Sequence, residues 1–307
     1  MRSDLAPSAE AFGKVILLGE HSVVYGHPAL AAGLPQGLRL EATRLPNPAD
    51  AISLSIPAWE LDLALLPGSE HPVAQAALAV LDVFDGPRTG WRIVGDTRLP
   101  SRAGLGSSAA LTVALARLVA PEAPVDAIID ASVVGERVFH GEPSGLDSAV
   151  AARGGVLRFV RGEAVEEIDV SASLALWILP SGMPRSTAVE VAKVRARRER
   201  LPSLMNPVLD ALGVAVRLGV EALMSNNLKL LGEIMKVSHE LVSGLGVGAP
   251  KLDQLVSQAH THGSAGAKLT GAGGGGCVIA LPPTDPAGLR QACAELGVVP
   301  LEVEVVR

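Results

Sequence analysis

This chain of 307 residues has few aromatic residues and no excess of positive charge. Phe, Trp and Tyr together make up 3% of it, so few rings are available to stack on nucleic-acid bases. The formal net charge of −6 at pH 7 disfavours a polyanionic partner. Both absences argue against a nucleic-acid-binding protein.

Cysteines and long apolar runs are scarce as well. The two cysteines, Cys277 and Cys293, are too few for a disulfide framework, and we expect both to be small buried side chains in a reducing compartment. No apolar run reaches the roughly 20 residues that span a bilayer. Residues 1–10 lack the pattern of a cleavable signal peptide. We therefore expect a cytoplasmic protein with no membrane partner.

Hydrophobic residues make up 48% of the chain, and with so few rings the core must be built from Ala, Val and Leu. The length suits one large or two medium domains, and the pattern predicts two α+β domains, residues 1–172 and 173–307. The strands are expected at 15–18, 37–43, 51–56, 155–160, 165–170, 175–179, 267–270, 277–281 and 301–306, and the helices at 73–84, 109–119, 126–139, 148–152 and 285–296, with mostly helix over 186–262.

The segment Leu99–Ala110 carries the strongest local signal. Its glycines, Gly104 and Gly106, let backbone approach a ligand without a Cβ clash. Two serines then open an apolar helical run, so hydroxyls and free N–H groups gather at the start of a helix. This pattern is typical of a phosphate site. A Gly-Ser helix cap with nothing bound is the alternative.

A second segment, Gly13–Gly26, begins an apolar strand with a lysine and ends it with Gly-Glu-His. Lys14 is costly to bury unless it is paired, so it either reaches solvent or faces a site. Glu20 and His21 are candidates for the same site. They could also be ordinary polar residues of a turn.

A third segment, Glu136–Ser148, places Glu136 and His140 one helical turn apart. They could form a surface pair, and no zinc motif is present. The turn Pro143–Gly145 presents Asp147. Taken alone, Asp147 would be read as the N-cap of the following helix.

A glycine-rich segment, Lys268–Ala280, formally contains G-x-G-x-x-G at Gly271, Gly273 and Gly276. A dinucleotide site needs a helix after these glycines, whereas a strand is predicted here. A Walker lysine pattern is absent too. The segment therefore indicates a close approach of backbone to a substrate or to another loop.

Taken in order, these segments resemble the motifs of the GHMP kinases, most closely the mevalonate kinases. Pro184–Thr187 also resembles a substrate-side segment of that group. Three positions depart from the pattern. Phe12 stands in place of proline, Arg102 in place of glycine and Glu142 in place of asparagine, and the last leaves the fine substrate preference open.

The resemblance implies a two-domain GHMP kinase fold. The N-terminal α/β domain should contain a left-handed βαβ crossover. The C-terminal domain should be ferredoxin-like α+β, with the active site in the cleft between the two. The implied reaction is ATP-dependent phosphorylation of the primary hydroxyl of mevalonate to 5-phosphomevalonate, a step of isoprenoid precursor synthesis.

The resemblance also assigns roles. Asp147 is the expected general base and Lys14 its catalytic partner, with ATP and Mg²⁺ as cofactors. Ser108 and Glu136 are the expected Mg²⁺ ligands. The ATP phosphates are expected at Arg102, Ala103, Gly104, Leu105, Gly106, Ser107 and Ser108. Mevalonate is expected at Glu20, His21, Arg185, Thr187, Gly271, Ala272 and Gly273, with Arg185 on its carboxylate.

Two alternatives stay open beside this function. The chain could be a sibling kinase acting on phosphomevalonate or a sugar. It could also be a ligand sensor without catalysis, although such proteins typically lose a catalytic group and none is missing here. A homodimer is a further expectation.

Overall fold

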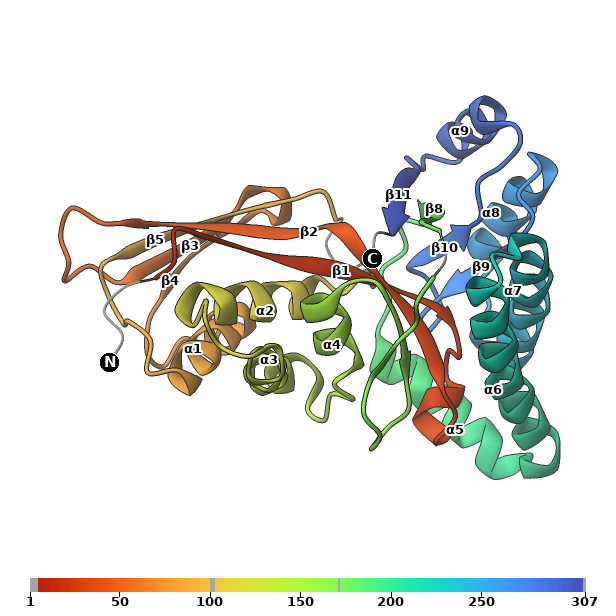
Figure 1. Ribbon diagram of the computed structural model, residues 1–307, viewed down its shortest axis with the longest axis horizontal. Coiled ribbons are helices and arrows are strands. Elements are labelled where there is room, and N and C mark those ends of the chain that lie inside the picture. The colour runs from red at the N-terminus through yellow and green to blue at the C-terminus, as the bar shows by residue number, and fades with distance from the viewer. Residues whose placement is uncertain (1–4, 100–102, 171, 306–307) are drawn as a thin grey trace. The chain divides into compact units, whose positions relative to one another are not determined.

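The computed structural model describes residues 5–99, 103–170 and 172–305, and its described residues form two compact units (Figure 1). The first unit takes its residues from Met1–Lys14, Pro35–Ser101 and Leu105–Gly154. The second takes them from Val15–Leu34, Arg102–Gly104 and Gly155–Arg307. The chain therefore passes between the units several times.

The first unit is a sheet with helices on one face. Its strands run in the order β4 (Leu61–Leu65), β3 (Ile52–Ile56), β5 (Trp91–Thr97) and β2 (Ala29–Arg44), and β1 (Ser8–Leu18) also pairs with β2. β3 and β5 are parallel, whereas β3 with β4 and β2 with β5 are antiparallel. Along β5, buried and exposed residues alternate strictly, as expected for a strand with one face on the core.

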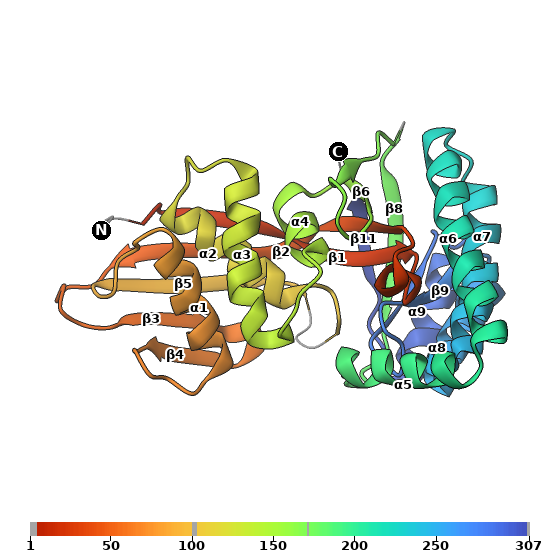
Figure 2. The same ribbon diagram turned by 90° about the horizontal axis from the view of Figure 1, so that it is seen from below.

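Four helices cover that face: α1 (Pro72–Val83), α2 (Ser107–Val119), α3 (Val125–His140) and α4 (Leu146–Arg153) (Figure 2). α2 is buried on nearly every side, from Ala109 to Ala116, because it packs against α1, α3 and α4. Its small alanines allow this close packing. The buried helix α2 therefore fixes the positions of α3 and α4, which carry Glu136 and Asp147.

The second unit contains a four-stranded antiparallel sheet with the order β11 (Leu301–Val305), β8 (Leu174–Pro180), β10 (Cys277–Ala280) and β9 (Ala267–Thr270). Figure 1 shows α6, α7 and α8 stacked beside β9 and β10. The helices of this unit are α5 (Thr187–Arg200), α6 (Pro202–Met224), α7 (Leu228–Val242), α8 (Pro250–Thr261) and α9 (Pro286–Glu295), with short turns η1 (Ser22–Tyr25) and η3 (Ser243–Val247). β6 (Val156–Phe159) pairs with the start of β2 and with β7 (Glu166–Glu167). The remaining short turn, η2 (Pro57–Trp59), belongs to the first unit.

The predicted α+β class is confirmed, and most predicted elements are found within two or three residues of their expected ends. β4 and β5 were not predicted, and β1 and β2 extend well beyond the expected strands. The start of β2 was missed because Ala29–Leu34 is almost wholly apolar and shows no alternation, as its fully buried side chains explain. Among the described residues, no helix is long and apolar enough to span a membrane.

Candidate active site

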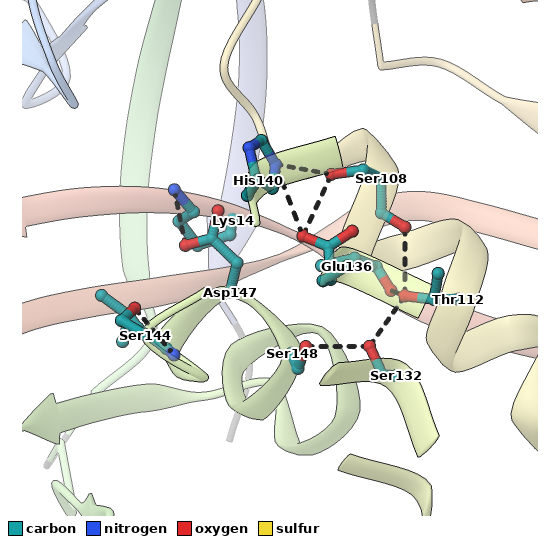
Figure 3. Close-up of polar contacts among 11 residues, drawn as sticks. Lys14, Ser108, Thr112, Ser132, Glu136, His140, Ser144, Asp147 and Ser148 are labelled. Carbon is teal, nitrogen blue, oxygen red and sulfur yellow. Dashed lines mark hydrogen bonds and ion pairs between the residues drawn. The ribbon is translucent and has the colours of Figure 1, made fainter. Parts of the chain in front are cut away.

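Lys14 and Asp147 form an ion pair inside the first unit (Figure 3). The Nζ of Lys14 lies 3.0 Å from Oδ1 of Asp147, and the Lys14 side chain is only 7% exposed. The carboxylate offsets the cost of burying the ammonium group. Gly145, not Asp147, caps α4, and Asp147 lies within the first helical turn. The N-cap interpretation of Asp147 is therefore wrong.

Glu136 is buried on α3, beside this pair (Figure 3). Its Oε2 accepts a hydrogen bond from Ser108 Oγ at 3.2 Å, while its Oε1 has no partner within the described part of the chain. Burial, helped by the negative charge of Asp147, raises the pKa of Glu136 to about 8, against the opposing effects of Ser108 and Lys14. The surface-pair interpretation is wrong for Glu136, because its side chain is only 1% exposed.

His140 lies one turn further along α3, at the mouth of the same cluster. Its Nε2 is 3.5 Å from Ser108 Oγ and 3.6 Å from Glu136 Oε2. Burial lowers the pKa of His140, which favours the neutral imidazole at pH 7. The i, i+4 spacing predicts that His140 lies beside Glu136, and the structure adds His140 to the residues of this cluster.

The start of α2 is open to an anion. Gly106 caps the helix with a left-handed φ of 77°, and none of the described side chains forms a capping hydrogen bond there. A Cβ at Gly106 would lie 3.0 Å from Cβ of Lys14, so the glycine permits this close approach. The hydroxyl of Ser107 is buried with no partner among the described residues. Free N–H groups and this orphaned hydroxyl are what a phosphate group would satisfy.

A second polar cluster belongs to the second unit and centres on Lys268. This lysine of β9 is fully buried and forms an ion pair with Glu20. Burial lowers the pKa of Lys268, and Glu20 opposes that shift. His21 has a left-handed φ of 60°, and its Nε2 lies 2.9 Å from the carbonyl oxygen of Ala272. Glu20 and His21 thus both contact the glycine-rich segment Lys268–Ala280, Glu20 through Lys268 and His21 through Ala272.

Arg185 lies against three glycines of the second unit. Its Nη1 donates to the carbonyl of Thr270 at 3.2 Å. A Cβ at Gly104, Gly271 or Gly276 would meet the Arg185 side chain, so the glycines make room for it. Thr187 lies in the first turn of α5 and is exposed. Arg102 lies outside the described residues.

The glycine-rich segment Gly271–Gly276 is held by neighbours in the second unit. The N–H of Gly274 donates a hydrogen bond to the carbonyl oxygen of Val247 at 2.7 Å. A Cβ at Gly274 would lie 2.6 Å from Glu190 Oε1. Glu190 is buried on α5, and its Oε2 has no partner within the described ranges.

Glu190 and Lys268 were not predicted as site residues. Glu190 lies in a helix rich in charge, where no pattern marks it as buried. Lys268 opens the glycine-rich segment in an apolar strand, and the cost of burying an unpaired lysine could have marked it as it did Lys14.

Few side chains of the described residues are placed to bind a metal ion. Within the described residues, no three His, Cys, Asp or Glu side chains gather closely enough to hold a metal ion. Ser108 and Glu136 instead offer two hard oxygens, one of them the unpartnered Oε1. Such a pair fits Mg²⁺, which keeps several waters and phosphate oxygens when bound.

Known proteins match both parts of the chain. Residues 71–155 match the family model described as GHMP kinases N terminal domain, and residues 220–298 match GHMP kinases C terminal. The mevalonate kinase of Pyrococcus furiosus is 34% identical over 97% of this chain and 96% of its own length. The chain belongs to the GHMP kinase family.

Solved structures agree with this family. The Methanococcus jannaschii mevalonate kinase has a TM-score of 0.84 and 26% identity, and all of both chains is covered. The L. major mevalonate kinase in complex with R-mevalonate has a TM-score of 0.83 and 27% identity, over 99% of this chain and 97% of that one. The expected GHMP kinase fold is therefore confirmed.

Within this GHMP kinase, the first unit brings together four predicted site residues: Lys14, Ser108, Glu136 and Asp147. The second brings together Glu20, His21, Arg185 and the glycine-rich segment. Thr187 has neither burial nor a described contact to support it. Each cluster thus has a geometry that a surface or capping role alone does not explain.

Proposed function

We propose that this GHMP kinase transfers the γ-phosphoryl group of ATP to the primary hydroxyl of mevalonate, giving 5-phosphomevalonate and ADP. The observation that carries the proposal is the contact between the buried ammonium of Lys14 and the carboxylate of Asp147, next to the Ser108–Glu136 pair. Similarity to mevalonate kinases over nearly the whole chain supports this choice of substrate.

Phosphoryl transfer requires positioning and charge neutralisation more than covalent chemistry by the protein. In the proposed mechanism, a carboxylate oxygen of Asp147 takes the proton of the substrate hydroxyl as the new P–O bond forms and the bond to ADP breaks. Lys14 holds that carboxylate in place and stabilises negative charge on the moving phosphoryl group. The short distance between the two side chains supports this division of roles.

The start of α2 is the proposed cradle for the ATP phosphates. Its uncapped N–H groups and the orphaned Ser107 hydroxyl support this assignment. The loop residues Ala103, Gly104, Leu105 and Gly106, together with Arg102, complete the proposed phosphate site.

Ser108 and Glu136 are the proposed protein ligands of Mg²⁺. A bound divalent cation would neutralise phosphate charge during transfer. Without a cation, Glu136 is a buried carboxylate whose pKa is raised to about 8. A cation next to it would restore its charge at neutral pH, which supports the assignment.

The second cluster is the proposed mevalonate side. Arg185 would pair with the carboxylate of mevalonate, since a planar guanidinium matches a carboxylate in two hydrogen bonds. Glu20 and His21 would contact the rest of the substrate. Gly271, Ala272 and Gly273 would form its wall, with Thr187 as a further hydrogen-bond donor.

A coupled assay of ADP release tests the proposal with mevalonate, phosphomevalonate, homoserine and galactose as acceptors. We expect mevalonate to give the highest kcat/KM by at least about tenfold, because the proposed site has one cation for one carboxylate. Higher kcat/KM with phosphomevalonate or galactose would establish a sibling kinase instead. ATP binding with no turnover of any acceptor would favour a sensor.

Cytoplasmic location and a homodimer are also proposed. Cys277 and Cys293 are both free and buried, which supports a reducing compartment. Sedimentation equilibrium of the purified protein measures the oligomeric state directly.

A further inference from the structure

Three buried hydroxyl groups connect the helices of the first unit (Figure 3). Thr112 Oγ1 on α2 lies 2.7 Å from Ser132 Oγ on α3, and Ser132 Oγ donates to Ser148 Oγ on α4 at 2.9 Å. None of the three side chains is more than 1% exposed. A chain of hydrogen bonds therefore joins α2, α3 and α4 below the cluster of Lys14, Glu136 and Asp147.

Each hydroxyl lies close in sequence to one functional residue on its own helix. Thr112 is one turn after Ser108, and its Oγ1 is also 3.2 Å from the carbonyl oxygen of Ser108. Ser132 is one turn before Glu136, and Ser148 directly follows Asp147. Each of α2, α3 and α4 therefore carries one hydroxyl of the chain and one of the side chains Ser108, Glu136 and Asp147.

Apolar packing alone would leave the relative register of these helices less well defined. Around Thr112 the helices approach closely, since a Cβ at Gly135 would lie 2.6 Å from the Thr112 methyl group. Contacts between small apolar groups are non-directional, whereas hydrogen bonds of 2.7 and 2.9 Å fix both distance and angle. Thr112 Oγ1 also lies 3.2 Å from the carbonyl oxygens of Ser108 and Ala109 on its own helix, but its link to α3, and the link from α3 to α4, each depend on a hydroxyl of the neighbouring helix. Shifting one helix therefore breaks the chain.

We propose that Thr112, Ser132 and Ser148 are positioning residues that set the distances between Ser108, Glu136 and Asp147 for phosphoryl transfer. This proposal rests on the proposed function of that cluster. It gives the hydroxyl chain a role in turnover, because small displacements of catalytic groups reduce the rate strongly.

The decisive variant is Ser132→Ala, which removes both hydroxyl–hydroxyl links. Ser264→Ala is the matched control, because Ser264 is also buried and donates at 2.8 Å to the carbonyls of Gly266 and Leu281 in the second unit. We expect both variants to lose similar stability in urea unfolding. Only Ser132→Ala should lower kcat, by about tenfold or more, with KM for mevalonate changed less than about twofold.

Metal binding gives a readout that does not depend on turnover. Mn²⁺, used as a spectroscopic substitute for Mg²⁺, is titrated by electron paramagnetic resonance in the presence of a non-hydrolysable ATP analogue. Ser132→Ala should raise the Mn²⁺ dissociation constant by about tenfold or more, since loss of the groups that support metal ligands weakens metal sites by about 10-fold to 100-fold. Ser264→Ala should leave it unchanged.

A second pair of variants covers the case in which Ser132→Ala does not fold. Thr112→Ser keeps the hydroxyl and should retain kcat and Mn²⁺ affinity within about twofold, whereas Thr112→Val keeps the shape and should lose both. Equal behaviour of the two Thr112 variants, or Ser132→Ala matching Ser264→Ala in kcat and Mn²⁺ affinity, would overturn the proposal. If the wild type binds the Mn²⁺–nucleotide but does not phosphorylate mevalonate, the proposed function fails while the metal titration still decides the positioning role.

Discussion

The carboxylate of Asp147 is 3.0 Å from an ammonium group that is itself buried, and it caps no helix. Asp147→Asn keeps the shape and removes the proton acceptor. We expect kcat to fall by about 100-fold or more, the usual contribution of general-base catalysis, with the dissociation constant for ATP nearly unchanged. Asp126→Asn is the control, because Asp126 is paired with Arg153 in the same unit. Near wild-type kcat in folded Asp147→Asn would remove Asp147 from the mechanism.

Glu136 predicts a pH dependence of stability in protein free of nucleotide and divalent cations. Its pKa is about 8 in the folded protein against an ordinary 4.5, so the folded state holds the proton more tightly than the unfolded chain. The stabilisation is complete below pH 4.5 and is lost as the pH rises towards 8, by on the order of a few kcal/mol. Asp147, Lys14 and His140 face the same carboxyl group and are retained throughout.

Urea unfolding of wild type and Glu136→Gln from pH 5 to pH 8.5 measures this effect. The difference in unfolding free energy between the two proteins should change steadily over that range, because Gln cannot titrate. A difference that is independent of pH would show that Glu136 is already ionised at pH 5.

A substitution of Arg185 should affect the KM for mevalonate and the KM for ATP differently. Arg185→Lys keeps the charge but loses the planar fork that lies against Gly104 and Gly271. We expect KM for mevalonate to rise with KM for ATP little changed, and kcat/KM to fall by about 1.5–3 kcal/mol in transition-state free energy. Arg197→Lys is a matched control, because the Arg197 guanidinium lies against Gly246 in the same manner. Unchanged KM values in both variants would assign Arg185 to loop stability.

Single residues also show how far sequence reasoning reached. The cost of burying a lysine in an apolar strand left two possibilities for Lys14, exposure to solvent or a partner in a site, and the structure shows the partner to be Asp147. The burial of Glu136 could not be predicted, because exposure depends on α2 and α4, which pack around it in the fold. Glu190 looked like any acidic residue on a charged helix, although it is buried against Gly274.

At the scale of elements, the start of α2 depends on the left-handed backbone of Gly106. Gly106→Ala would strain a φ of 77° and bring a Cβ within 3.0 Å of Lys14. We expect a loss of about 1–2 kcal/mol of stability and, beyond it, a clear rise in KM for ATP, because the N–H groups of the first turn shift. Gly162→Ala is the control.

Gly162 has a similar φ of 87° but no atom within 4 Å of its Cβ position. It should therefore show the backbone cost without an effect on ATP. Equal KM values for ATP in the two variants would contradict a phosphate site at α2.

The helices and strands differ in how well the sequence predicts them. The helices with a clear apolar period, such as α1 and α3, were found within a residue or two of their ends. β4 was missed because its five residues are short and partly exposed, and its pairing with β3 provides what its sequence does not signal. β5 was missed as well, because Val94 is exposed while Gly95 and Thr97 are buried, so its sequence shows no apolar–polar alternation.

For the whole molecule, the predicted division at residue 172 stays a prediction, while the compact units take their residues from alternating stretches of chain. Periodicity cannot reveal such interleaving, because it reports on neighbours along the chain. β1 and β2 each contribute residues to both units. If one unit unfolds, its half of each shared strand becomes disordered, and this disturbs the half that belongs to the other unit. We therefore expect both units to unfold together.

Two probes that belong to different units test this expectation. Cys277 and Cys293 are buried in the second unit, and burial raises the pKa of the Cys277 thiol to about 12, so neither thiol should react in the folded protein at pH 8. Trp59 and Trp91 report on the first unit once Trp177→Phe removes the tryptophan of the second. In Trp177→Phe, thiol labelling and tryptophan fluorescence should change at the same urea concentration, as in a two-state transition. Labelling that is complete before the fluorescence changes would show that the second unit opens alone, and the shared strands would then not couple the two.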